Sequence, residues 1–159
     1  MTGERAAALI ERLRLQPHPE GGFYAEVHRS QASVDPLDGR MQRAAQTSIY
    51  FLLPAGVVSR WHRVRSDELW CHLEGSPIEL HLLHDRVPST TVLAPLSAAT
   101  QPQQVVPAWH WQAARSLGDY SLAACCVAPG FDFDDFELMP DTDPLRDWIA
   151  QRHPALVAY

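Results

Sequence analysis

The sequence contains neither lysine nor asparagine, and its thirteen basic residues are all arginines. Without lysine, the chain cannot supply the amine of a Schiff base or the phosphate-binding lysine of a P-loop. Acidic residues exceed basic ones, so the formal net charge is −6. Because affinity for nucleic acid depends largely on Lys and Arg that neutralise phosphates, we expect no nucleic-acid partner.

Cysteines are few, and long apolar segments are missing. Cys71, Cys125 and Cys126 form neither a C-x-x-C pair nor an even disulfide framework. No apolar N-terminal segment resembles a signal peptide, and the longest apolar runs are far too short to cross a bilayer. We therefore expect a cytoplasmic protein with buried, reduced thiols and no membrane partner. If Cys125 and Cys126 lie on a strand, they point to opposite faces, so at most one faces a pocket.

The length of 159 residues, with 46% hydrophobic and 20% charged residues, predicts one globular domain over residues 1–159. Helical spacing and capping residues predict short terminal helices at about 3–14 and 143–152. The region between them, about 18–138, reads as a succession of short strands separated by turn signals, which favours a sandwich or barrel. The predicted strands span residues 23–29, 46–53, 68–73, 78–83, 90–93, 104–106 and 121–127.

One stretch combines residues that can perform chemistry at regular spacing. Gly56 is followed by His62 after six residues, by Glu68 after six more, and by Gly75 after another seven. This spacing fits two strands whose ends direct side chains into one cavity. Imidazole and carboxylate are the pair that proteins use either to hold a divalent metal or to move a proton.

This stretch resembles the first sequence motif of the cupins, Gly-x5-His-x-His-x3–4-Glu-x6-Gly, with Val64 in place of the second histidine. Residues 107–112 resemble the second motif, Pro-x-Gly-x-x-His, with Trp109 in place of the glycine and Gln112 in place of the histidine. Two of the four metal ligands of the family are therefore replaced.

A wider resemblance is to a subgroup of cupins of undefined function. It rests on the order and spacing of four segments, HPEGGFY at 18–24, TSIYFLL at 47–53, SDELW at 66–70 and VAPGF at 127–131. The resemblance implies a mainly β fold, an antiparallel jelly-roll barrel of the RmlC-like type, commonly a homodimer, with a small-molecule pocket at the motif residues. It implies no established substrate.

The leading functional hypothesis is a small-molecule-binding protein with metal-independent acid-base chemistry of the epimerase or isomerase type. His62 is the predicted acid or base, and Glu68 is predicted to fix its tautomer or share its proton. Metal-free sugar epimerases of the superfamily combine a histidine base with a tyrosine acid, which implies Tyr24 or Tyr50 as the partner here. The other predicted residues of the pocket wall are Glu20, Trp70, His72 and Gln112.

Two alternatives stay open. The first is a divalent-metal-dependent oxygenase or hydrolase, with His62, Glu68 and Gln112 as an incomplete ligand set, because these residues offer only one strong nitrogen donor. The second is a non-catalytic ligand-binding or sensory module. The cofactor is accordingly none or a divalent metal.

Two surface features are also interpreted from the sequence. The acidic run at 131–137 is expected to be mainly a solvated surface. Among the arginines, Arg63 is the favoured anchor for an anionic group of the ligand.

Overall fold

The computed structural model describes residues 2–159. In chain order the elements are α1 (Thr2–Arg12), β1 (Gln16–Pro17), β2 (Phe23–Arg29), β3 (Ser33–Val34), β4 (Arg43–Ala44), β5 (Thr47–Pro54), β6 (Val58–Val64), β7 (Asp67–Gly75), β8 (Ile78–His84), β9 (Val87–Leu93), β10 (Gln103–Val106), β11 (Trp111–Ser116), β12 (Tyr120–Ala128), η1 (Phe133–Asp135), β13 (Phe136–Leu138), α2 (Pro144–Arg152) and η2 (Pro154–Leu156).

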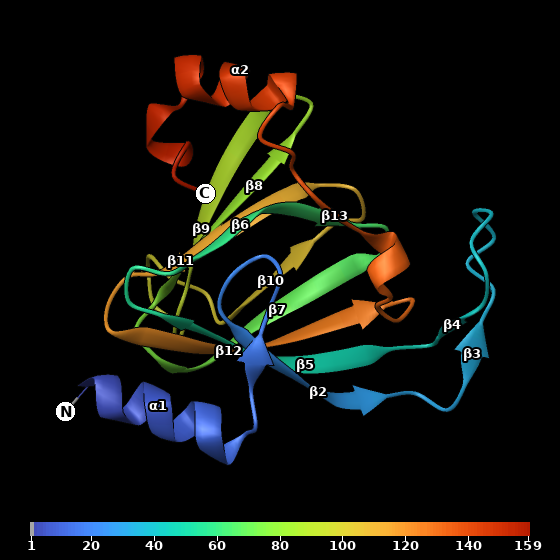
Figure 1. The fold of residues 1–159 in the computed structure, drawn as a ribbon, viewed down its shortest axis with the longest axis horizontal. Helices are drawn as coiled ribbons and strands as arrows, with labels where there is room; N and C mark the ends of the chain where they lie inside the picture. The colour runs from blue at the N-terminus through green and yellow to red at the C-terminus, as the bar shows by residue number, and fades with distance from the viewer. Residues whose placement is uncertain (1) are drawn as a thin grey trace.

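Two antiparallel sheets form the body of the molecule (Figure 1). The first has the strand order β1-β2-β5-β12-β7-β10, and the second has the order β13-β6-β11-β8-β9. Neighbours in each sheet are mostly distant in sequence, as in a jelly roll, where the chain crosses repeatedly between two sheets. The mainly β, antiparallel fold with two short terminal helices confirms the prediction from the sequence.

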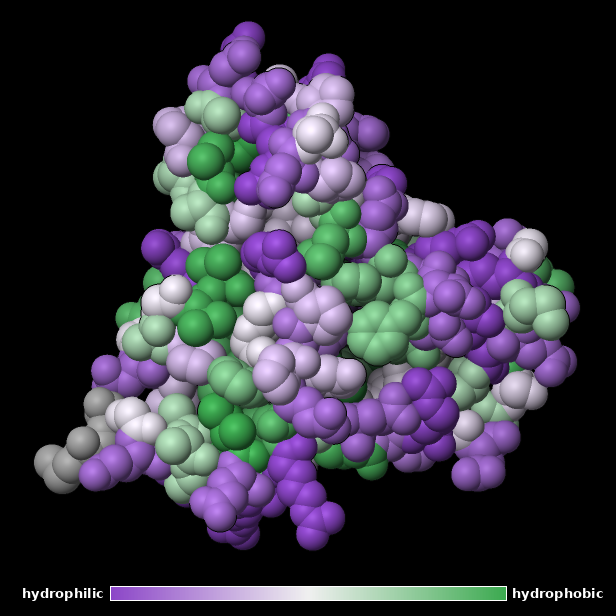
Figure 2. Space-filling view, viewed as in Figure 1, coloured by the Kyte–Doolittle hydropathy of each residue, from purple (hydrophilic) through white to green (hydrophobic). Residues whose placement is uncertain are grey.

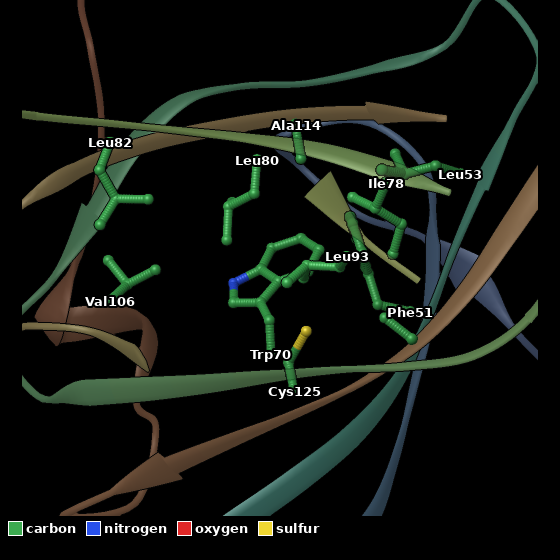
Figure 3. Packing of buried hydrophobic residues seen from close by; sticks show 11 residues of the cluster. Phe51, Leu53, Trp70, Ile78, Leu80, Leu82, Leu93, Val106, Ala114 and Cys125 are labelled. Atoms are coloured by element: carbon green, nitrogen blue, oxygen red, sulfur yellow. The ribbon is translucent and has the colours of Figure 1, made fainter. Parts of the chain in front are cut away.

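The main core lies between the two sheets and is filled by alternate residues of their strands. Figure 3 shows Trp70 of β7 at its centre, with Cys125 beside it and Phe51, Leu80 and Leu93 around it. Trp70 and Phe51 are almost completely buried and meet edge to face, with ring centroids 5.5 Å apart. The packing of Trp70 against Phe51 therefore holds β7 and β5 together in the core, and these strands also carry residues of the site.

The outer faces of both sheets are covered by the terminal segments (Figure 1). On the first sheet, Ala6 and Leu9 of α1 pack against Leu52 and Leu122. On the second sheet, a separate apolar cluster joins Trp61, Leu83, Trp111, Met139, Ile149 and Tyr159. As a result, β5 is buried on both faces, with Phe51 and Leu53 inside and Leu52 outside.

The helices match the predicted ones with shifts at their ends. α1 ends at Arg12 rather than at residue 14, because the backbone turns into the left-handed region at Arg14, where φ is 54°.

Within residues 2–159, no helix combines the length and apolar character that a membrane crossing requires. Hydrophilic residues cover most of the face shown in Figure 2, and hydrophobic residues form scattered groups among them.

Candidate functional site

A cavity of about 660 Å³ opens between the sheets at one end of the barrel. Its lining residues come from β2, β5, β6, β7 and β12, from the segment between α1 and β2, and from residues 131–133 at the start of η1. Exposed residues such as Arg14, Glu26 and Arg29 mark its rim, whereas buried polar residues mark its inner end. The buried polar residues that line it are His18, Glu20, Thr47, His62 and Glu68.

The loop at 18–22 holds the first two of the chemically active residues. Gly21 has a φ of 114°, which L side chains rarely adopt, and a Cβ there would lie 2.1 Å from the carbonyl oxygen of Val58. The loop therefore packs directly on β6, and the amide of Arg60 donates to the carbonyl oxygen of Glu20 over 2.9 Å. Only glycine allows this close approach, which places Glu20 next to the site on β6.

His62 projects from β6 into the cavity and is 2% exposed. Its Nδ1 lies 2.7 Å from the carbonyl oxygen of Arg60. A carbonyl oxygen only accepts, so Nδ1 carries the hydrogen, and in the neutral ring Nε2 keeps its lone pair. Burial lowers the pKa of His62, which favours the neutral ring. His62 therefore presents a basic nitrogen to the site.

Glu20 lies between two histidines. Its Oε2 is 3.3 Å from Nε2 of His62 and 3.2 Å from Nδ1 of His18, while Ser59 donates to Oε1 over 2.7 Å. Nδ1 of His18 accepts the backbone amide of Glu20, so both ring nitrogens beside Oε2 are acceptors. One proton must lie among these three groups. Burial raises the pKa of Glu20 to about 7 and lowers the pKa values of both histidines, which favours Glu20 as the group that carries this proton.

Glu68 forms the second carboxyl group of the inner end. Gln112 donates from Nε2 to its Oε2 over 2.6 Å, and Trp70 donates from Nε1 to Oε1 of Gln112 over 2.8 Å. Because an indole N–H only donates, it fixes the amide so that its NH₂ group faces Glu68. Burial raises the pKa of Glu68 to about 7, and the nearby Glu20 adds to this rise.

Aromatic side chains form much of the remaining wall. His18 meets Tyr24 edge to face at 4.6 Å between ring centroids and stacks on Phe133 at 6.0 Å. The aromatic residues that line the cavity are Tyr24, Phe51, Trp70, Phe131 and Phe133. The inner end is therefore a pair of carboxyl groups and a pair of histidines within an apolar, aromatic enclosure.

The structure brings together some of the predicted pocket residues and separates others. Glu20, Tyr24 and Trp70 line the cavity, whereas Gln112 lies behind it, between Trp70 and Glu68. Tyr50 does not line the cavity, because it points to the other face of β5, toward α1. His72 also lies away from it, further along β7, where its ring contacts the carbonyl oxygen of Ser76 at 3.1 Å.

Two expected roles need correction. The orientation of His62 depends on the carbonyl group of Arg60 rather than on Glu68, whose Oε2 accepts from Gln112. Arg63 lies outside the cavity: it pairs with Glu137 at 2.7 Å and packs over Trp111, with its guanidinium carbon 4.4 Å from the ring centroid.

Three features of the site were not predicted. His18 precedes Glu20 by two residues in the HPEGGFY segment, which was the available signal. Phe131 and Phe133 belong to the run at 131–137, of which only the carboxylates were interpreted, most of them as a solvated surface. In the same run Asp135 is only 4% exposed, because Arg40 and Arg43 bind its carboxylate at 3.1 Å and 2.8 Å.

The predicted metal-ligand set does not fit the geometry. The amide oxygen of Gln112 accepts from Trp70, and the amide presents donors to Glu68. Val64 has no donor atom for a metal. Within residues 2–159, no group of three or more His, Cys, Asp or Glu is arranged to hold a metal ion. His62, Glu68 and Gln112 therefore do not form a coordination site in this arrangement, and we derive no step through a metal.

The comparisons with known proteins agree with the fold. The family described as "Cupin superfamily (DUF985)", Cupin_5, matches residues 7–139. A hypothetical protein from Leishmania major is 34% identical with a TM-score of 0.81, and the alignment covers 96% of this chain and 94% of that one. A protein from Shewanella oneidensis is 35% identical with a TM-score of 0.81, over 96% and 92% of the two chains.

A more distant similarity is confined to the fold. Oxalate decarboxylase from Bacillus subtilis is 12% identical with a TM-score of 0.58, and the alignment covers 87% of this chain and 34% of the decarboxylase. No curated protein matches the chain.

Proposed function

The chain belongs to the cupin superfamily, in the family Cupin_5 (DUF985), and we propose that its barrel binds a small polar molecule and transfers a proton on it. The observation that carries this proposal is the contact between Nε2 of His62 and Oε2 of Glu20, 3.3 Å apart at the inner end of a cavity. One of these groups holds a basic lone pair and the other holds a proton, which are the two states that proton transfer needs.

The pair is suited to an isomerisation or epimerisation. His62 removes a proton from a carbon atom next to a carbonyl group of the ligand, and Glu20 delivers its own proton to the resulting anion. Transfer of the proton from Nε2 of His62 to Oε2 of Glu20 then restores the starting state, so protons balance over one cycle. Burial supports this role, because it raises the pKa of Glu20 to about 7 and lowers the pKa of His62, which favours a protonated carboxyl group beside a neutral imidazole.

We expect His62→Gln to abolish this proton transfer without loss of the fold. A thermal-shift screen of sugars, nucleotides and small acids first identifies ligands. Each ligand is then incubated with protein in D₂O, and deuterium incorporation at carbon is followed by NMR. The wild type should exchange, and His62→Gln should be slower by at least about 100-fold, the usual contribution of a positioned acid or base.

The matched control is His84→Gln, which changes an exposed histidine of β8 outside the cavity and should exchange like the wild type. If a ligand stabilises the wild type but exchanges no deuterium, the proposed proton transfer is contradicted and the protein is better described as a non-catalytic binding module. One tightly bound metal per chain in protein purified without chelators, lost in His62→Gln, would also contradict the metal-free proposal.

A further inference from the structure

The inner end of the cavity carries two carboxyl groups, and within residues 2–159 no arginine that lines the cavity is buried with them. The exposed Arg60 lies close enough to Glu20 to favour its ionised form, whereas Glu68 has no such neighbour among the causes of its pKa shift. Glu20 and Glu68 are 5% and 7% exposed and both line the cavity. Among the described residues that line it, only Arg14 and Arg29 are always cationic. Both are exposed at the rim, and Arg29 is bound to Glu26 through two hydrogen bonds of 2.9 Å and 2.7 Å. A carboxylate at the inner end therefore has no buried arginine as its partner among the described residues that line the cavity.

The two carboxyl groups differ in what already neutralises them. Glu20 is neutralised by the proton that it holds beside His18 and His62, and its Oε1 also accepts from Ser59. Glu68 has two neutral donors, the amide of Gln112 and the thiol of Cys125, and neither carries a positive charge. A carboxylate offers about four acceptor positions, so Glu68 keeps free acceptor capacity toward the cavity. A buried carboxylate without a cationic partner is costly, and a bound cation would remove that cost.

The walls are suited to the same kind of ligand. Tyr24, Phe51, Trp70, Phe131 and Phe133 line the same cavity as the two carboxyl groups and give it aromatic surface. Aromatic rings attract cations through the negative charge of their faces, and they exclude water that would weaken a charge-assisted hydrogen bond. The geometry is therefore an aromatic enclosure with an acceptor at its inner end.

We propose that the ligand of this cavity carries a protonated amine, which is bound by Glu68 within the aromatic wall. This inference rests on the proposed function, since it names the class of molecule on which the His62–Glu20 pair acts. An ammonium group donates three hydrogen bonds, so it can bind Glu68 and still leave the neighbouring carbon within reach of His62. A neutral alcohol would leave the charge of Glu68 uncompensated, and an acid would meet two carboxyl groups.

Two series of probes with matched shapes test this directly. One comprises tyramine, tyrosol and hydroxyphenylacetate; the other comprises putrescine, butanediol and succinate. Each series keeps its skeleton and changes the end group from amine to alcohol to acid. Binding is measured by calorimetry at pH 8 on chelator-treated full-length protein. We expect the amine of at least one series to bind at least about tenfold more tightly than its alcohol and its acid.

The variant Glu68→Gln separates charge from shape. Its amide can still accept from Gln112, so the fold should persist, while the amine should lose at least about tenfold in affinity and its preference over the alcohol. Asp85→Asn is the control: it removes an exposed carboxylate from the β8–β9 turn, at a left-handed position that asparagine tolerates, and should bind like the wild type.

Tighter binding of an alcohol or an acid would overturn the inference, as would an amine preference that survives Glu68→Gln or the absence of binding at millimolar concentration in both series. These outcomes are distinguishable from failure of proton transfer. If amines bind in a Glu68-dependent manner but exchange no deuterium, the proposed ligand class is supported and the proposed proton transfer is contradicted. If a neutral or acidic ligand shows His62-dependent exchange, the proton transfer is supported and the ligand class is contradicted.

Discussion

Replacing Gly21 by alanine should cost more than about 3 kcal/mol of stability and displace Glu20 from His62. Two separate penalties combine at this position. The φ of 114° is strained for any L residue, and the new methyl group would meet the Val58 carbonyl oxygen at 2.1 Å, at the start of β6. For a chain of this size such a loss lowers the melting temperature by roughly 10 °C, which thermal denaturation followed by circular dichroism would measure.

Gly39→Ala isolates the contribution of the close contact. Gly39 also has a positive φ, 86°, but a Cβ there would meet nothing within 4 Å. Gly39→Ala should therefore lower the free energy of unfolding only by the backbone strain, about 1–2 kcal/mol. If the two variants were equally stable, the loop at 18–22 would not be held by its contact with β6, and the position of Glu20 would need another explanation.

The fold was predictable because most strands are short runs rich in β-branched and aromatic residues and are separated by turn residues. Phe23–Arg29, the strand β2, has the predicted bounds, and the other predicted strands differ by a few residues at their ends. The strand β11 was not among the predicted strands. Its sequence, WQAARS, is poor in β-branched residues, and it is a strand because β6 and β8 pair with it on both sides.

The site was predictable where the motif spacing fixed a residue and its neighbours, as for His62 and Glu68. It was not predictable for Tyr50, because β5 is apolar on both faces. Its inner residues meet the core and its outer residues meet α1, so the sequence does not tell which face is which. Ile49 and Phe51 line the cavity instead.

The partners of His62 depend on tertiary contacts that spacing along one chain segment does not encode. Glu20 reaches His62 because a loop more than thirty residues earlier packs on β6. Gln112 was correctly placed near Glu68, but the direction of its amide depends on the indole of Trp70. The first contact depends on how a loop packs on β6, and the second depends on how β11 and β7 face each other. Both are determined only when the two sheets are assembled.

The contribution of Glu20 and Glu68 to stability should fall as the pH rises from about 4.5 to about 7, since burial raises both pKa values from 4.5 to about 7. Over this range the two folded carboxyl groups retain protons that they release in the unfolded chain, so their part of the free energy of unfolding decreases with pH. Histidines with lowered pKa values, including His18 and His62, act in the opposite direction below pH 6.5. The effect of the carboxyl groups should therefore be clearest at pH 8, where the histidines are neutral in both states.

Glu68→Gln should make the protein more stable than the wild type at pH 8 and about equally stable at pH 4.5. A pKa rise from 4.5 to about 7 corresponds to about 3 kcal/mol, because one pKa unit is worth 1.36 kcal/mol. Urea denaturation at several pH values gives the difference between the two proteins, and Asp85→Asn, at an exposed turn, should follow the wild type throughout. If the difference stayed constant with pH, Glu68 would already be ionised and compensated in the folded protein. A counterion would then exist at the inner end of the cavity, which would contradict the charge balance on which the amine site depends.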